Sequence, residues 1–482
     1  MSNLYVFAIG GSGSRVLRSL TMLLASGVQV SNNIIPIIVD PDSKNGDLTR
    51  VVNEMRLYKQ IHDSLSFNSS LNSTFFSANI SSLNNDGEFL LPLTGTAGIN
   101  FDAYIRLNTM SMENQAMMKM LFSNNNLSST MDVGFKGNPN IGSVVLNQFI
   151  QSTEYKTFET NFIDGDRVII LSSIFGGTGA SGFPLLLKTM RTSNNAALAT
   201  APIASVSLLP YFNLKDDPKS SIKADSFVTK MKAALNYYEY NVTGNGTLDE
   251  QYYLGDQLSS KPYDNCEGGN DQKNNAHVIE MLAALAIVDF DSKVYQANNS
   301  RNTKFHEFGL NTVPSGAIVF SDFADTKDSI IKPLTQMALM NSYLNNRDQS
   351  HRTSQRWSKE DNERLGRKFF GGAFFKDYSK FKTDSVDSGF EAWLSQLAQN
   401  DKSFSPFVAD TDLKSTDGLA KVVGYKPHYK GFVMVKKGYD LMDVTLDRYY
   451  KKLPQGLDAP SSFFEIFFNM TNELCSQNLD IN

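Results

Sequence analysis

The chain has 482 residues, of which 41% are hydrophobic and 20% charged, so we expect two or three globular domains. Its net charge of −5 at pH 7 argues against a protein that holds nucleic acid by neutralising phosphates over a broad surface. The two cysteines, Cys266 and Cys475, cannot build a disulfide framework, and neither has a partner at the spacing of a zinc site.

The N-terminal residues predict a strand followed by a glycine turn, without the basic and apolar segments of a signal peptide. The longest apolar run, Met281–Val288, is shorter than a membrane span. We therefore expect a cytoplasmic protein with no membrane span and no direct contact with nucleic acid.

Strand and helix patterns alternate over the first 290 or so residues, which is typical of a mostly parallel sheet covered by helices on both faces. The expected strands are Tyr5–Ile9, Ile34–Val39, Arg167–Ser172 and Pro202–Leu209. The expected helices are Arg15–Ala25, Phe183–Met190 and a helix that begins near Asn275. Residues His277–Phe290 of that last helix are apolar on nearly all sides, so it should be buried between layers or domains.

The pattern weakens after residue 290. We expect a strand at Ala317–Phe320, a helix at Asp325–Tyr343 and two strand-like runs within Val422–Val435. The polar segment Asn345–Lys368 reads as a solvated linker or loop. Together these features predict an α/β domain followed by a divergent α+β C-terminal domain.

The first glycine-rich turn, Gly10–Ser14, follows a buried strand and opens a helix. A helix N-terminus presents unpaired N–H groups, and glycine lets the backbone approach phosphate oxygens closely. The turn therefore indicates an anion site, although a tight turn without a ligand would have the same sequence. A dinucleotide-binding reading, with Asp40 holding a ribose, lacks the third glycine because Val16 stands there.

The second glycine-rich turn lies between Phe175 and Gly182 and is more informative. Its sequence, FGGTGASG, places four glycines and two hydroxyls between a strand and a helix. It resembles the signature loop of tubulins and FtsZ, which wraps the diphosphate of a bound nucleotide. The chain departs from that pattern at Phe175, where the family has glycine, and in the extension Ala180-Ser181-Gly182.

Other segments match the tubulin/FtsZ pattern in the same order along the chain. Ala97-Gly98-Ile99-Asn100 is similar to the family's loop at the terminal phosphate, and Pro210-Tyr211-Phe212 is similar to its turn near the sugar. Asn274 and Asn275 precede the apolar helix, where the family contacts the base. The resemblance implies a nucleotide-binding domain at residues 1–274, a central connecting helix at 275–296 and a divergent domain at 297–482.

The hydrolytic step of the family requires acidic residues that a neighbouring subunit places next to the terminal phosphate. Phe320–Asp325 shares the sequence DFAD with the corresponding stretch of FtsZ, which would make Asp322 and Asp325 catalytic. A helix N-terminus capped by Asp322 would explain both carboxylates without catalysis.

The resemblance implies a GTP-binding protein that assembles head-to-tail and hydrolyses GTP to GDP with Mg²⁺ at the subunit interface. The alternatives are a non-polymerising nucleotide-binding module whose C-terminal domain binds a protein partner, and an NAD(P)-dependent oxidoreductase. No site for a protein-bound metal is expected from the sequence. The expected nucleotide-binding residues are Gly10, Gly11, Ser12, Gly13, Ser14, Asp40, Ala97, Gly98, Asn100, Gly176, Gly177, Thr178, Gly179, Ala180, Ser181, Asn274 and Asn275.

Overall fold

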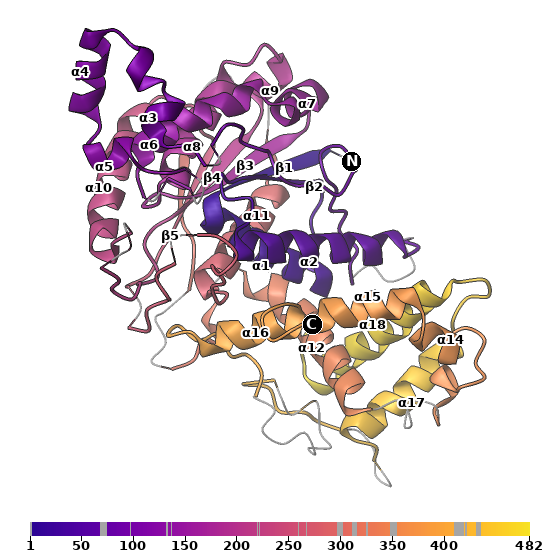
Figure 1. The fold of residues 1–482 in the computed structure, drawn as a ribbon. Coiled ribbons are helices and arrows are strands. Elements are labelled where there is room, and N and C mark those ends of the chain that lie inside the picture. The colour runs from indigo at the N-terminus through magenta and orange to yellow at the C-terminus, as the bar shows by residue number, and fades with distance from the viewer. Residues whose placement is uncertain are drawn as a thin grey trace. The chain divides into compact units, whose positions relative to one another are not determined.

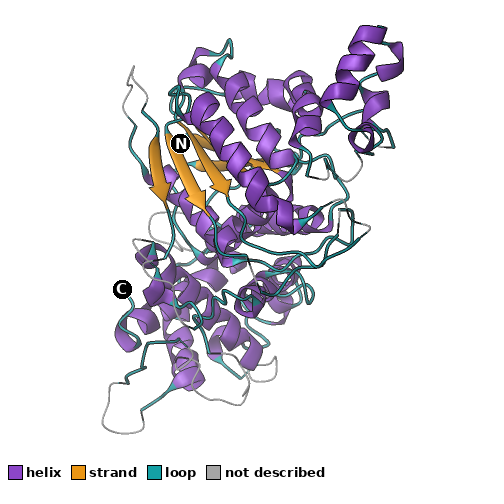
Figure 2. Ribbon diagram, turned by 90° about the vertical axis from the view of Figure 1, so that its left-hand side faces the viewer, coloured by secondary structure: helices purple, strands orange, loops and turns teal. Residues whose placement is uncertain are grey.

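A six-stranded parallel sheet forms the centre of the N-terminal region in the computed structural model (Figures 1 and 2). The strand order is β2-β1-β3-β4-β5-β6, and every neighbouring pair is parallel. The first four strands are apolar and almost completely buried, as expected for strands covered on both faces. The strands are β1 (Asn3–Ile9), β2 (Asn33–Val39), β3 (Arg167–Ser173), β4 (Ile203–Leu208), β5 (Glu250–Leu254) and β6 (Lys304–Glu307).

The register aligns the carboxyl ends of the central strands at one edge of the sheet. Ile9 at the end of β1 pairs with Val39 of β2 on one side and with Ser172 of β3 on the other. From β1 the chain proceeds outward to β2, whereas from β3 it proceeds in the opposite direction to β4. Ligands of open parallel sheets bind outside the carboxyl ends of the strands at such a reversal, so the fold points to the edge between β1 and β3.

Helices cover both faces of this sheet. Phe7 of β1 and Ile170 of β3 belong to one apolar core with Phe158 of α7 and Phe183 of α8. The helix α11 (Val278–Ser292) packs against β4 and β5, and twelve of its fifteen residues are buried. The other helices in this region are α3 (Phe101–Tyr104), α4 (Met112–Leu121), α5 (Asn124–Leu127), α6 (Pro139–Val145), α7 (Thr153–Asn161), α8 (Thr178–Arg191), α9 (Ala196–Thr200) and α10 (Phe227–Tyr238).

The chain divides into two compact units. The first comprises Met1–Arg18, Ser31–Asn53 and Ile80–Phe308, and the second comprises Ser19–Val30, Glu54–Asn79 and Gly309–Asn482. Both units therefore contain part of α1 (Gly10–Ser26) and part of α2 (Gly46–Asp63). The structure describes residues 2–67, 75–96, 98–131, 134–135, 137–218, 220, 222–258, 260–266, 268–295, 302–310, 316–323, 326–347, 354–408, 419, 422–429 and 435–482.

The second unit is built from helices around an aromatic core. Trp357 and Phe467 pack edge to face with ring centroids 5.6 Å apart, and Phe463 and Tyr378 extend the same cluster. Trp393 is fully buried, and its indole nitrogen donates a hydrogen bond to Ser19. The helices are α12 (Lys327–Asn346), α14 (Arg367–Phe370), α15 (Ala373–Lys382), α16 (Phe390–Gln399), α17 (Gly438–Tyr450) and α18 (Ala459–Asn478).

The structure confirms the α/β fold with a parallel sheet and the four strands expected from the sequence. The expected strand at Ala317–Phe320 is wrong, because Ile318 forms only an isolated bridge with Phe404 and a short 3-10 helix begins at Phe320. In Val422–Val435, Val422 forms an isolated bridge with Phe407, and residues 430–434 lie outside the described part of the chain.

Two further expectations need correction. The segment Asn345–Lys368 was expected to be solvated, but its Trp357 is fully buried because it packs into the aromatic core. The apolar helix begins at Val278 rather than near Asn275, because the side chain of His277 accepts a hydrogen bond from Ile279 N and caps the helix. Among the described residues, no helix is long and apolar enough to span a membrane.

Candidate functional site

The two glycine turns identified in the sequence meet at the carboxyl edge of β1 and β3. Gly10 opens α1 with a φ of +75°, a conformation that favours glycine. A Cβ atom at Gly10 would lie 3.4 Å from Cβ of Thr178, the first residue of α8, and 3.8 Å from the backbone nitrogen of Gly179. Two helix N-termini, each with unpaired N–H groups, therefore begin side by side.

A cavity lies directly over these two helix N-termini, within the first unit. Its walls combine glycine turns with acidic, amide and aromatic side chains. The lining residues that carry the argument are Gly10, Gly11, Ser12, Arg15, Asp40, Asp42, Gly134, Gly137, Phe175, Gly176, Gly177, Thr178, Gly179, Phe212, Phe227, Asp264, Cys266, Gln272 and Asn274.

The glycines of the two turns have different reasons to be glycine. A Cβ atom at Gly13 would lie 2.9 Å from the carbonyl carbon of Ala8, and one at Gly179 would lie 2.6 Å from the carbonyl oxygen of Ser173. At these two positions, the close packing of the backbone is by itself a sufficient reason for glycine. Gly11 differs, because among the described residues no atom outside its chain neighbours and the adjacent backbone of α1 lies within 4 Å of the position its Cβ would take. Its φ is also outside the left-handed region, so neither packing nor backbone conformation explains glycine at this position of the cavity wall.

Arg15, in the second turn of α1, is held by a buried hydrogen-bond network at the cavity wall. Its Nε donates to Oε1 of Glu280 at 2.6 Å, and its Nη2 donates to the hydroxyl of Tyr211 at 2.8 Å. Glu280 is fully buried, accepts from the Tyr211 hydroxyl at 2.8 Å, and also accepts from the backbone nitrogen of His277. One carboxylate thus connects α1, the turn after β4 and the N-terminus of α11.

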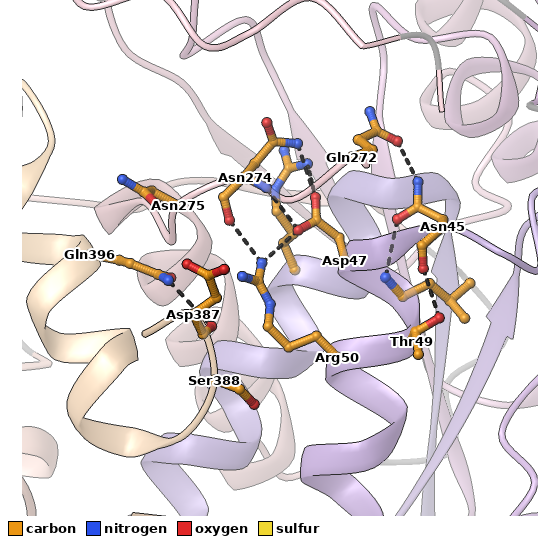
Figure 3. Close-up of polar contacts among 12 residues, drawn as sticks. Asn45, Asp47, Thr49, Arg50, Gln272, Asn274, Asn275, Asp387, Ser388 and Gln396 are labelled. Carbon is orange, nitrogen blue, oxygen red and sulfur yellow. Dashed lines mark hydrogen bonds and ion pairs between the residues drawn. The ribbon is translucent and has the colours of Figure 1, made fainter. Parts of the chain in front are cut away.

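A second buried carboxylate, Asp47, anchors the segment that precedes α11 (Figure 3). Its Oδ1 accepts from the backbone nitrogen of Asn274, and its Oδ2 accepts from the side-chain nitrogen of the same residue, both at 2.9 Å. Arg50 forms an ion pair with Asp47 and donates to the carbonyl oxygen of Asn274 at 2.8 Å. Asn45 caps α2 and bonds to Gln272. The side chain of Asn274 is therefore fixed at the cavity wall.

Asp40, at the end of β2, is a buried carboxyl group in the cavity wall. Burial raises its pKa from 3.8 to about 7, the backbone N–H of Asp42 lowers it in part, and the charge of Asp42 raises it further. Asp42 accepts a hydrogen bond from the backbone nitrogen of Gly269 at 2.6 Å. Asp40 therefore changes its charge near neutral pH.

Three phenylalanines form an apolar part of the wall. Phe175 lies 4.9 Å from Phe227 and 5.7 Å from Phe212, measured between ring centroids. The guanidinium of Arg15 lies 5.6 Å from the centroid of the Phe212 ring. Phe175 and Phe227 are almost fully buried, so Phe212 is the one of the three rings that keeps partial exposure.

The cavity brings together ten of the residues expected from the sequence and leaves others elsewhere. Gly10, Gly11, Ser12, Asp40, Gly176, Gly177, Thr178, Gly179 and Asn274 are among its lining residues, as is Phe212 of the expected turn. Gly13 and Ser14 lie behind the first turn, where the Ser14 hydroxyl donates to the carbonyl oxygen of Gly10. The Ser181 hydroxyl donates to the carbonyl oxygen of Gly177. The Tyr238 hydroxyl donates to the carbonyl oxygen of Ala180.

The remaining expected residues are placed as follows. Asn100 forms an isolated bridge with Thr130, Gly98 precedes it with a φ of +69°, and neither lines the described cavity wall. The carbonyl oxygen of Asn275 accepts from the Tyr263 hydroxyl. Asp322 accepts a hydrogen bond from the backbone nitrogen of Val319 at 2.7 Å. Ala97 and Asp325 lie outside the described residues.

Sequence reasoning missed a third glycine-containing segment of the wall. Gly137 has a φ of +72°, and Gly134 one of +85°. The backbone nitrogens of Gly137 and Asn138 lie 3.1 Å from the position that a Cβ of Gly177 would take. Gly134 and Gly137, followed by Asn138-Pro139 at a helix start, were the sequence signal from which this segment could have been inferred. Among the described residues, no group of three or more His, Cys, Asp or Glu side chains is placed to hold a metal ion.

No protein-family model and no curated protein matches the chain. Among solved structures, the chain is similar to CetZ from Methanosaeta thermophila, with 13% identity over 62% of this chain and a TM-score of 0.29. It is also similar to CetZ2 from Haloferax volcanii, a GTPγS-bound protofilament, with 11% identity over 61% of this chain and a TM-score of 0.29. CetZ1 from Haloferax volcanii, a GDP-bound monomer, gives 13% identity over 61% and a TM-score of 0.30.

The chain spans 57%, 60% and 62% of the lengths of these three structures, respectively. Similarity at this level does not establish a family for the chain.

Replacing Glu280 should destabilise the first unit strongly. Glu280→Ala leaves the buried Arg15 without its nearest carboxylate, and breaking one side of a buried ion pair costs about 3–5 kcal/mol. The free energy of unfolding, measured by guanidinium titration, tests this. The double variant Arg15→Met/Glu280→Ala should lose less than the sum of the two single variants. Additive losses would contradict the coupling of the two side chains.

The carboxyl group of Asp40 should make stability depend on pH. Between pH 3.8 and about 7 the unfolded chain ionises Asp40 while the folded chain keeps its proton, so stability is lost as the pH rises through this window. Asp40→Asn removes that loss. At pH 8 the variant should have a free energy of unfolding higher than that of the wild type by on the order of a few kcal/mol, and so unfold at a higher temperature. At pH 4 its stability should differ little from that of the wild type. Equal gains at both pH values would exclude this explanation.

Proposed function

We propose that the protein binds a nucleoside phosphate in the cavity over the N-termini of α1 and α8, with its phosphates against the two glycine turns. The observation that carries the proposal is Gly11. It lines the cavity, and among the described residues nothing in the fold occupies the space its side chain would need. A ligand that approaches the backbone closely supplies the reason for glycine at this position.

The other parts of the cavity suit the other parts of a nucleotide. Phe212, which is only partly buried, offers a ring against which a base can pack, and the almost fully buried Phe175 and Phe227 support it. Asp40, which carries a proton below about pH 7, can hydrogen-bond a sugar hydroxyl. The resemblance of the GGTGASG turn to the tubulin/FtsZ signature makes GTP or GDP, accompanied by Mg²⁺, the expected ligand.

Gly11→Ala separates ligand binding from folding. The added methyl group would enter the cavity, so the affinity for GTP and GDP should fall at least about tenfold. The melting temperature should stay the same or rise slightly, because alanine is favoured over glycine in a helix. Isothermal titration calorimetry and thermal unfolding provide the two measurements.

Gly13→Ala is the matched control for that variant. Its Cβ would lie 2.9 Å from the backbone of Ala8, so it should unfold at a lower temperature than the wild type. If Gly11→Ala bound GTP and GDP as well as the wild type does, the proposed site would be wrong.

We further propose, from the resemblance, that GTP binding drives head-to-tail assembly and that hydrolysis takes place between subunits. Asp322 is the candidate catalytic carboxylate of this proposal. Its carboxylate accepts a hydrogen bond from the backbone nitrogen of Val319 and so stabilises the short 3-10 helix Phe320–Asp322. The expectation that Asp322 caps the following helix is wrong, because α12 begins at Lys327 with Thr326 at its N-cap. A purely structural role for this hydrogen bond favours the alternative of a nucleotide-binding module that does not polymerise and uses its C-terminal unit to bind a protein partner.

Sedimentation with GTP and Mg²⁺ distinguishes the two proposals. Assembly predicts GTP-dependent pelleting and GTP turnover per subunit that rises with protein concentration. Asp322→Asn should then lower turnover at least about tenfold while GTP affinity stays unchanged. Tight GTP or GDP binding without pelleting or turnover would instead support the non-polymerising module.

A further inference from the structure

Lys230 lies in the first turn of α10, and its side chain is half-buried next to the cavity wall. A Cβ atom at Gly137 would be only 2.8 Å from the Lys230 Nζ, so the ammonium group packs directly on the backbone of Gly137. Gly137 is itself a lining residue of the cavity. Its φ of +72° strongly favours glycine, and the absence of a side chain leaves room for the ammonium.

Gly137, which lies beside the Lys230 ammonium group, also lies beside the second glycine turn. The position of a Gly177 Cβ lies 3.1 Å from the backbone nitrogen of Gly137, and Gly177 immediately precedes the first residue of α8. Gly137 thus neighbours both the Lys230 ammonium group and the residue that precedes α8. A ligand phosphate at that N-terminus would lie within the range of a strong charge interaction.

Three other basic groups near the cavity, among the residues that the structure describes, have carboxylate partners. Arg15 pairs with Glu280 and with Asp47, Arg50 pairs with Asp47, and Lys215 pairs with Asp264. For Lys230, no ion pair or hydrogen bond with a carboxylate is found within the described part of the chain. Burial lowers its pKa, since a partly desolvated ammonium group is less stable in its charged form.

An unpaired, half-buried cation beside an anion-binding turn is costly in the free protein and favourable once an anion is bound. Asp40 and Asp42 also line the cavity, and each would repel a phosphate when ionised. Backbone N–H groups do not respond to a further negative charge as strongly as an ammonium does. The extra charge of a terminal phosphate is therefore where Lys230 would contribute most.

We propose that Lys230 neutralises the terminal phosphate of a bound nucleoside triphosphate and makes the site prefer a triphosphate to a diphosphate. This inference rests on the proposed nucleotide-binding function of the same cavity. It makes Lys230 a specificity-determining residue outside the glycine turns.

The test compares Lys230→Met with Lys232→Met, which removes an exposed lysine from the same helix. Titration calorimetry with a non-hydrolysable GTP analogue and with GDP gives the two affinities of each variant. Lys230→Met should bind the triphosphate about ten- to a hundredfold more weakly and GDP within about twofold of the wild type. Lys232→Met should bind both as the wild type does. Lys230→Arg, which keeps the charge, should recover part of the triphosphate affinity.

Three results would overturn the inference, and they differ from one another. Unchanged triphosphate binding by Lys230→Met would show that the ammonium does not act on the ligand. Equal losses of affinity for triphosphate and diphosphate would show that the Lys230 ammonium group acts on an inner phosphate or stabilises the fold. Melting temperatures would distinguish these two explanations. If the wild type bound neither nucleotide, the proposed function itself would fail. Lys230→Gln provides the same comparison if Lys230→Met does not fold.

Discussion

The reversal of strand order between β1 and β3 is the constraint on which the site depends. Because the chain leaves these neighbouring strands in opposite directions, the helices that follow them begin at the same edge but are not packed over it. Gly10 and Thr178 lie so close across that edge that a Cβ atom at Gly10 would be 3.4 Å from the Cβ of Thr178. Two helix N-termini then present unpaired N–H groups to one cavity, and the local sequence needs to add only residues small enough for a ligand to approach.

The charges around the cavity follow from the same geometry. Arg15, from the second turn of α1, points toward the turn after β4 and the start of α11, where Glu280 neutralises it. Asp47 does the same for Arg50 and fixes the segment before α11 through Asn274. Buried pairs of this kind hold the wall in one arrangement but leave little net charge for a ligand. The proposed binding of an anion therefore rests mainly on backbone N–H groups and on Lys230.

The sheet and the two glycine turns at its edge could be predicted from the sequence because both are local signals. Continuous apolar runs such as Arg167–Ser172 identify buried parallel strands, and glycines after them identify the turns. The position of Gly137 in the cavity wall could not be predicted, because it depends on packing between segments forty residues apart. Lys230 could not be predicted either, because no sequence motif surrounds it. The expected strand at Ala317–Phe320 failed because apolar residues there pack as an isolated bridge and a 3-10 helix. Asn274 lines the cavity, as its position before the apolar helix suggested. Its hydrogen bond to Asp47 could not be predicted, because Asp47 belongs to α2, far away in the sequence.

The central claim is that the cavity over α1 and α8 holds a nucleotide. The most direct measurement is to purify the protein without added nucleotide, denature it by heat, and identify the released small molecules by chromatography. The account predicts GDP or GTP in a constant ratio to protein, and a much smaller amount from Gly11→Ala purified in parallel. Release of NAD(P), or of no nucleotide even after incubation of the protein with GTP or GDP, would contradict it.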